Sequence, residues 1–268
     1  MGNLISSKVV TLREAFNIRQ GEVISLVGAG GKTTLMSALA HELVNEKVRI
    51  ISTTTTKIFE WQAWGDFLEI EKDGGKMLGD LPRILAEYRH ITLASEKIPS
   101  EGKLKGISPE TIVNIAESRQ VDYIIIEADG AAMKLIKAPN ATEPVIPQNT
   151  TLVIAVIGID ALGVILNKEN VFRPELVSRL TGLPIGEVIT ADTIATLVTH
   201  SGGITKGSPP DARIIPVINK MDLSKDIGEA RKIAQKIIEL DYPRIRRVVL
   251  CQLQSIKPIV DIITGLKR

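Results

Sequence analysis

The sequence predicts an α/β fold in three layers, with a mostly parallel sheet covered by helices on both faces. Strand-length apolar runs alternate with stretches of helical periodicity along most of the 268 residues, which is the pattern of repeated strand–helix units. Hydrophobic residues make up 44% of the chain and aromatic residues only 3%, so the core consists mainly of Ile, Val, Leu and Ala. Such aliphatic strands are typical of parallel sheets buried on both faces.

The elements can be placed one after another from these periodicities. Pro109 suits the first turn of a helix, where its missing N–H costs nothing. The stretch from about 162 to 210 is expected to be a helical insertion on the same single domain. Strands are predicted over 22–27, 48–52, 67–71, 91–94, 123–127, 152–157, 213–218 and 248–251, and helices over 32–44, 76–88, 109–119, 174–180, 192–200, 225–240 and 257–268.

A glycine-rich motif stands between the first strand and the first helix. Small residues there let backbone N–H groups surround an anion, and the helix adds the positive end of its dipole. Lys32 is expected to reach the β- and γ-phosphates of a nucleotide, and the Thr33 hydroxyl to bind Mg²⁺. Leu26 stands where the longer form of the motif has its first Gly. The motif is therefore a short P-loop, Gly28-Ala29-Gly30-Gly31-Lys32-Thr33-Thr34.

Acidic and hydroxyl side chains follow two other strands. Glu127 and Asp129 end the apolar run 123–126, at the carboxyl edge where α/β sheets bind ligands. We expect Asp129 to orient Mg²⁺ through its water ligands and Glu127 to position the attacking water. Residues 53–56 are four consecutive threonines, with Thr54 as the candidate Mg²⁺ ligand; a Thr-rich extension of the strand is the alternative.

A possible base-recognition motif ends the strand 213–218. Asn219-Lys220-Met221-Asp222 resembles the Asn-Lys-x-Asp motif of GTPases. A carboxylate such as Asp222 accepts hydrogen bonds from the ring N–H and the exocyclic amine of guanine, a pair of donors that adenine lacks. This favours GTP over ATP. The Ser-Ala element that usually accompanies the motif is not evident around Cys251.

Together these motifs resemble the metallochaperone branch of P-loop GTPases. The runs 127–130, 137–139 and 143–147, with the P-loop, are more specifically similar to the YqeC family, described as accessory proteins of selenium-dependent hydroxylases. The resemblance covers most of the chain. It implies GTP binding with slow hydrolysis, a switch at residues 53–56, and a molybdenum hydroxylase or its cofactor-assembly proteins as partner. By analogy with related GTPases, a homodimer is possible.

The proline-rich stretch after Asp129 suggests a further phosphate contact. Its prolines prevent a helix, so Lys137 and Glu143 are expected on a fixed loop beside the γ-phosphate. Lys137 would offer charge to phosphate or to an anionic ligand; a rigid connector with exposed charges is the alternative. Arg173 and Lys206 are further candidates of the same kind.

Composition excludes several classes of function. Lys and Arg exceed Asp and Glu only by 33 to 31, which argues against nucleic-acid binding. No apolar run reaches membrane-spanning length, the N-terminus lacks the pattern of a signal peptide, and Cys251 has no disulfide partner in the chain. We therefore expect a soluble, cytoplasmic protein. Scattered His41, His90 and His200 predict no stable transition-metal site, and Cys251 is expected to be a buried strand residue rather than a reactive thiolate.

Two other functions stay open. The short loop also looks like that of Mur ligases, so an ATP-dependent ligase-like or kinase-like enzyme is one alternative. The other is a binding module that senses nucleotide without hydrolysing it.

Overall fold

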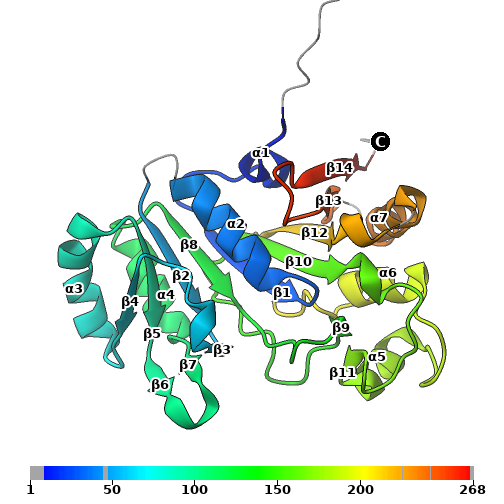
Figure 1. Cartoon of the computed structure of the whole chain (residues 1–268), viewed down its shortest axis with the longest axis horizontal. Helices are drawn as coiled ribbons and strands as arrows, with labels where there is room; N and C mark the ends of the chain where they lie inside the picture. Colours follow the sequence, from blue (N-terminus) through cyan, green and yellow to red (C-terminus); the bar gives the residue numbers. More distant parts are fainter. Residues whose placement is uncertain (1–8, 45–47, 225, 242, 266–268) are drawn as a thin grey trace, which may run out of the picture.

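A nine-stranded sheet forms the centre of the computed structural model, which describes residues 9–44, 48–224, 226–241 and 243–265 (Figure 1). All neighbouring strands are parallel except the pair β13 and β14. The order across the sheet is β14 (Ile259–Thr264), β13 (Arg247–Cys251), β12 (Arg213–Asn219), β10 (Leu152–Gly158), β1 (Val23–Gly28), β8 (Tyr123–Glu127), β2 (Ile50–Thr54), β5 (His90–Ala94) and β4 (Phe67–Ile70).

Helices cover both faces of this sheet, which confirms the predicted three layers. In β1, Val23 and Val27 face one hydrophobic core, and Ile24 and Leu26 face the other. This alternation follows from the two-residue period of a strand. One face carries α1 (Leu12–Phe16) and α2 (Lys32–Val44); the other carries α3 (Gly74–Glu87), α4 (Pro109–Glu117), α6 (Ala191–Thr199) and α7 (Ile227–Asp241).

The stretch 162–210 forms the connection from β10 to β12. It holds β11 (Val171–Phe172), α5 (Pro174–Thr181) and α6. Ile194, Leu197 and Val198 of α6 belong to the same core as the strands and α7. The short strand β11 pairs in parallel with β9 (Ile136–Lys137), so this connection also fastens the segment that follows Asp129.

The predicted C-terminal helix over 257–268 is wrong. The structure has the edge strand β14 there, antiparallel to β13, and residues 266–268 lie outside the described ranges. Five of the six residues of β14 are β-branched, which favours a strand, and pairing with β13 completes that preference. The start of the helix predicted over 225–240 also lies outside the description at Lys225; α7 begins at Ile227. Residues 1–8, part of the N-terminus that was expected to lack a signal-peptide pattern, likewise lie outside the description.

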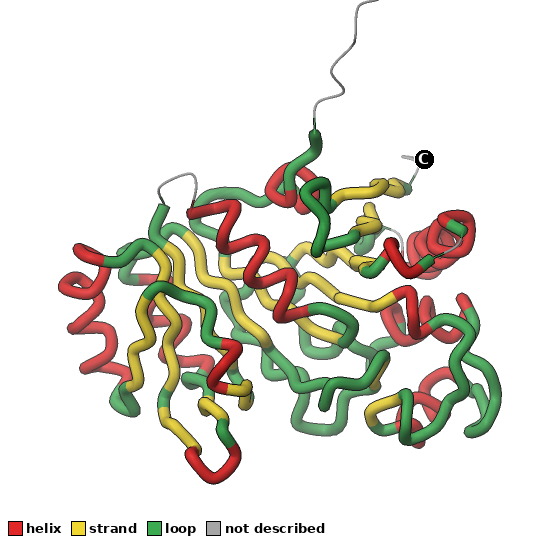
Figure 2. Tube along the Cα trace, in the orientation of Figure 1, coloured by secondary structure: helices red, strands yellow, loops and turns green. Residues whose placement is uncertain are grey.

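Two small features were not predicted. The short helix α1 is stabilised by a capping box between Thr11 and Glu14, a pattern that satisfies N–H groups at the helix start. A three-stranded antiparallel sheet of β3 (Lys57–Phe59), β7 (Lys103–Lys105) and β6 (Glu96–Ile98) extends beyond the carboxyl ends of β2 and β5 (Figure 2). Ile58 and Leu104 bury its inner face against Ala94.

Among the described residues, no helix combines the length and apolar character required to cross a membrane.

Candidate functional site

The loop between β1 and α2 is held tightly against neighbouring backbone. Gly28, Gly30 and Gly31 have φ of +95°, +97° and +131°, conformations that favour glycine. A Cβ on Gly30 would lie 2.1 Å from the backbone nitrogen of Gly158 on β10. The N–H of Ala29 donates to the carbonyl of Val156 over 2.9 Å. The loop thus rests directly on the end of β10, at the carboxyl edge of the sheet.

Lys32 lies among carboxylates at the first turn of α2. Its ammonium donates to the carbonyl of Gly28 over 2.7 Å and lies 3.0 Å from Asp129 Oδ1 and 3.6 Å from Glu127 Oε1. Burial opposes the charged form, but the attraction of the two carboxylates outweighs it and raises the pKa of Lys32. Lys32 is therefore a cation at the loop, as a phosphate ligand must be.

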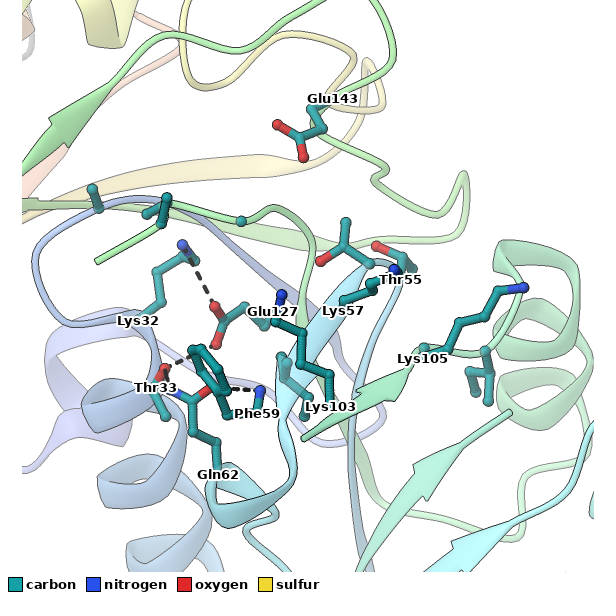
Figure 3. Close-up of a pocket in the computed structure, with 18 of the residues that line it drawn as sticks. Lys32, Thr33, Thr55, Lys57, Phe59, Gln62, Lys103, Lys105, Glu127 and Glu143 are labelled. Carbon is teal, nitrogen blue, oxygen red and sulfur yellow. Dashed lines mark hydrogen bonds and ion pairs between the residues drawn. The ribbon is translucent and has the colours of Figure 1, made fainter. Parts of the chain in front are cut away.

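Glu127 and Asp129 both face Lys32 but have different surroundings. Glu127 lines an open cleft and accepts a hydrogen bond from the Thr33 hydroxyl over 3.1 Å (Figure 3). Burial raises the pKa of Glu127, against the opposing effect of Lys32. Asp129 is fully buried: Oδ2 accepts from the N–H of Gly28 over 3.0 Å. Asp129 thus supports the loop from behind, and Glu127 is the acid that reaches the cleft.

Lys137 is also buried behind the loop. Its ammonium lies 3.0 Å from Asp129 Oδ2 and 3.3 Å from Glu143 Oε2, and its side chain is 0% exposed. Arg173 donates to Glu143 over 2.7 Å. Lys206 donates to the carbonyl of Asn140 over 2.6 Å. These cations fasten the stretch after Asp129. Lys137 has carboxylate partners here, and its contact with phosphate stays a prediction.

The four threonines after β2 separate into two pairs. Thr53 and Thr54 are fully buried, and the Thr54 hydroxyl donates to the carbonyl of Glu127 over 2.7 Å. Thr55 and Thr56 line the cleft, and the Thr55 hydroxyl donates to the carbonyl of Val145 over 2.7 Å. Of this segment, Thr55 and Thr56 are therefore the residues placed to meet a ligand.

The Asn-Lys-x-Asp motif supports the loop from the other side. Buried Asn219 donates from Nδ2 to the carbonyl of Gly30 over 3.0 Å and accepts from the N–H of Leu253 over 3.3 Å. Lys220 pairs with Asp160 at 2.6 Å. Asp222 is exposed in the 3₁₀ turn η4 (Met221–Leu223). Asn219 thus ties the loop to the chain after β13, and Asp222 does not line the cleft.

The cleft itself has a volume of about 1160 Å³ and extends from the loop toward the small sheet. Gln62, which follows β3, donates to the Thr33 hydroxyl over 3.3 Å. Lys57 of β3 and Lys103 and Lys105 of β7 line the side of the cleft away from Lys32 (Figure 3). Sequence reasoning missed these residues. For Lys103 and Lys105, the alternation of charged and apolar residues in Lys103-Leu104-Lys105 could have indicated a strand with one exposed face.

Other candidates lie away from this cleft. Cys251 is buried in β13, where burial raises the pKa of its thiol to about 12, so it stays protonated and unreactive in the folded chain. His90 is buried, while His41 and His200 are exposed. Within the described ranges, no three His, Cys, Asp or Glu side chains gather in a way that could hold a metal ion.

Comparison with known sequences identifies one family. The family described as "YqeC protein" matches residues 24–175, a range that includes the loop, Glu127, Asp129 and Lys137 but ends before Asn219. The chain is 31% identical over 223 residues to the protein named "Uncharacterized protein YqeC" of Escherichia coli (strain K12), which covers 83% of this chain and 85% of that protein.

Solved structures show a more distant similarity. The hydrogenase maturation factor HypB from Archaeoglobus fulgidus has a TM-score of 0.40 at 12% identity, with 92% of this chain and 86% of that chain covered. FtsY from Mycoplasma mycoides has a TM-score of 0.37 at 10% identity, with 93% and 65% covered. The fold assignment therefore rests on the strand order and on the strand–loop–helix geometry described above.

Proposed function

The chain belongs to the YqeC family, as its motifs predict, and we propose that it binds a nucleoside triphosphate with Mg²⁺ at the loop from Gly28 to Thr34 and hydrolyses it slowly. One observation carries this proposal. The loop joins a parallel strand to the N-terminus of α2 and brings Lys32, Thr33 and Glu127 together at one cleft. That combination provides backbone donors, a cation and a hydroxyl for phosphates and their metal.

Hard oxygen atoms at the loop suit Mg²⁺. The Thr33 hydroxyl and the Glu127 carboxylate lie 3.1 Å apart, and Mg²⁺ prefers such ligands together with phosphate oxygens and water. Bound there, the ion would neutralise charge on the phosphates. Asp129 and Thr54 are less suited to this role than the sequence suggests, because both are fully buried and already hydrogen-bonded.

Glu127 is also placed to accept a proton during hydrolysis. The oxygen of a water molecule would bond to the γ-phosphorus while the bond from that phosphorus to the β–γ bridging oxygen breaks, and the nucleoside diphosphate leaves. The proton of the water would pass to the Glu127 carboxylate, which lines the cleft. Lys32 would hold the phosphate oxygens. Gln62, bonded to Thr33, would help to order this end of the cleft.

The biological role follows from the family resemblance. The protein would act in the cytoplasm as an accessory factor in the maturation of a selenium-dependent molybdenum hydroxylase, with the hydroxylase or its cofactor-assembly proteins as partner. Nucleotide would order the segment 53–56, of which Thr55 and Thr56 line the cleft, and so change the surface that a partner meets. A homodimer around the nucleotide is part of the same proposal.

Calorimetric titration of GTP and of ATP, each with Mg²⁺, tests the choice of nucleotide. We expect GTP to bind at least tenfold more tightly, about 1.4 kcal/mol, and Asp222→Ala to abolish this preference. Lys32→Ala should weaken both nucleotides alike, which makes it the control for the loop. Equal binding, or a preference for ATP that Asp222→Ala leaves unchanged, would discard guanine recognition.

A second function, phosphoryl transfer by an ATP-dependent kinase-like enzyme, is favoured by one observation. The cleft continues past Glu127 toward the small sheet, and so leaves room for an acceptor. Turnover would distinguish the two: release of inorganic phosphate from nucleotide and protein alone supports hydrolysis, whereas turnover that requires an added acceptor supports transfer. A module that only senses nucleotide would show neither.

A further inference from the structure

We infer that the part of the cleft beyond the loop is a second ligand site, and that it takes a small organic phosphate next to the γ-phosphate position. The inference rests on the proposed function only in assigning the loop end of the cleft to nucleotide. The site consists of Lys57, Lys103 and Lys105 on the small sheet, with the N-terminal residues of α3 and α4 beside them.

The size of the cleft leaves space for two ligands. Its volume is about 1160 Å³, above the range of roughly 300 to 1,000 Å³ for small-molecule sites. The loop residues from Ala29 to Thr34 occupy one end only. Of the base motif, Lys220 lines the cleft and Asp222 does not.

The charged residues that line the cleft favour an anionic ligand. Seven lysines and three glutamates line the cleft, an excess of four positive charges in a chain whose formal net charge is only +2. A concave surface with low-dielectric walls strengthens such a field and draws ions of the opposite sign into it. Lysine also binds phosphate readily as a compact point charge.

Three lysines share the cleft face of the small sheet. Lys57 stands directly opposite Lys105 in the antiparallel pair of β3 and β7, and Phe59 opposite Lys103. Directly opposed residues share a face of the sheet, as do residues two apart, and like charges in that position destabilise it. Lys57 lies 2.8 Å from Glu101, and Lys105 lies 3.9 Å from Glu96. Neither glutamate lines the cleft. A bound phosphate would relieve this repulsion from the cleft side.

The N-termini of two helices, α3 and α4, also line the cleft. Gly74 at the first turn of α3 and Ser108, Pro109 and Thr111 at the start of α4 line the cleft. With α2 at the loop, three helix N-termini open onto one cavity. The Asp73 carboxylate caps α3 and offsets its partial positive charge, so α2 and α4 are the helices whose dipoles favour an anion there. The lysine face, the helix starts and the volume therefore agree on a phosphate-bearing molecule of modest size.

Thermal unfolding with phenyl phosphate tests the site. The protein would first be saturated with Mg²⁺ and the β,γ-imido analogue of GTP, so that the probe cannot use the loop; binding of the analogue, measured separately, reports on the proposed function by itself. If the analogue does not bind, the titration is run on Lys32→Ala, whose loop lacks its phosphate-binding cation. We expect a saturable rise in unfolding temperature with phenyl phosphate, and little or none with benzoate, which has the same ring but a carboxylate.

The double substitution Lys57→Gln and Lys105→Gln should weaken phenyl phosphate binding at least tenfold. Both side chains are about half exposed, so the variant is expected to fold. Lys97→Gln is the matched control, because Lys97 lies on the neighbouring strand β6 and does not line the cleft. No binding of phenyl phosphate by the wild type, equal binding of benzoate, or equal loss in Lys97→Gln would each overturn the inference.

Discussion

Two lysine–carboxylate pairs with the same N–O distance have different roles in this molecule, because one is buried and the other is exposed. Lys137 lies 3.0 Å from Asp129 and both side chains are 0% exposed, whereas Lys103 lies 3.0 Å from Glu101 with the side chains 30% and 38% exposed. Water screens the second pair and can replace either partner, but it cannot reach the first. The buried pair is therefore a permanent part of the loop's support, and the exposed pair is available to exchange its carboxylate for a ligand.

The largest effect is expected when the buried pair is broken. Asp129→Ala would leave the ammonium groups of Lys32 and Lys137 without their shared carboxylate and the N–H of Gly28 without its acceptor. Breaking such a buried pair typically costs about 3 to 5 kcal/mol, measurable by urea unfolding. A loss below about 1 kcal/mol would mean that the pair is no more structural than an exposed one.

His90 extends the comparison to a buried titratable group that forms no ion pair within the described residues. Burial lowers the pKa of His90 from its usual 6.5 to about 4, with a small opposing effect of Asp66, and its Nε2 lies 2.8 Å from the Ser52 hydroxyl. Because the unfolded chain takes up this proton first, stability that is present above pH 6.5 is lost as the pH falls toward 4.

The size of that loss can be measured against a variant. Between pH 7 and 4.5 the wild type should lose roughly 2 to 3 kcal/mol more than His90→Gln in urea unfolding. His41→Gln is the control, since His41 is exposed, and it should follow the wild type. Parallel pH profiles for all three proteins would show that His90 is not a buried neutral imidazole.

Asn219 supports the same loop as the buried pair of Lys137 and Asp129, but through hydrogen bonds between uncharged groups. Asn219→Ala would remove its hydrogen bonds to Gly30 and Leu253 and should cost about 1 to 3 kcal/mol of stability. Because these contacts hold the loop that binds either nucleotide, we expect GTP and ATP affinities to fall by the same factor. A selective loss of GTP would place Asn219 in base recognition instead.

The smallest effect is expected on the exposed side. Glu101→Gln removes the carboxylate shared by Lys57 and Lys103 and should leave the free energy of unfolding nearly unchanged, because water screens an exposed pair. The same variant should bind phenyl phosphate more tightly than the wild type, because a competing carboxylate is gone. Weaker binding would show that Glu101 positions the lysines for the ligand.

The sequence predicted the parts of the fold that local patterns specify. The parallel strands, α2 and the glycine loop follow from apolar runs and from residues with special backbone conformations. The strand β14 was missed although its β-branched residues favour a strand, because the periodicity of so short an apolar run does not separate a strand from a helix. The small sheet was missed for the same reason, since its strands have three residues each.

The site was predicted by residue and only partly by role. Glu127 and Asp129 look equivalent as two acids at a strand end, and only the packed structure shows that β8 ends at Glu127 and that Asp129 continues beneath the loop. Nothing in the sequence around Lys137 indicates that it is buried. Lysine is seldom buried without a partner, and the partner of Lys137, Asp129, lies eight positions away in the chain. Burial of a charge depends on contacts between segments, which a local pattern does not contain.

The contact between Gly30 and Gly158 has a consequence for the history of this protein. A methyl group on Gly30 would meet the backbone of Gly158, which no change of side chain removes, whereas one on Gly158 would meet the end of the Asp160 side chain, 2.1 Å from Oδ1, which a substitution of Asp160 could remove. Lineages can therefore exchange lysines on the small sheet one at a time, whereas Gly30 is closed to substitution. Homologous chains of greatly different age should share Gly30 after most of the cleft around it has diverged.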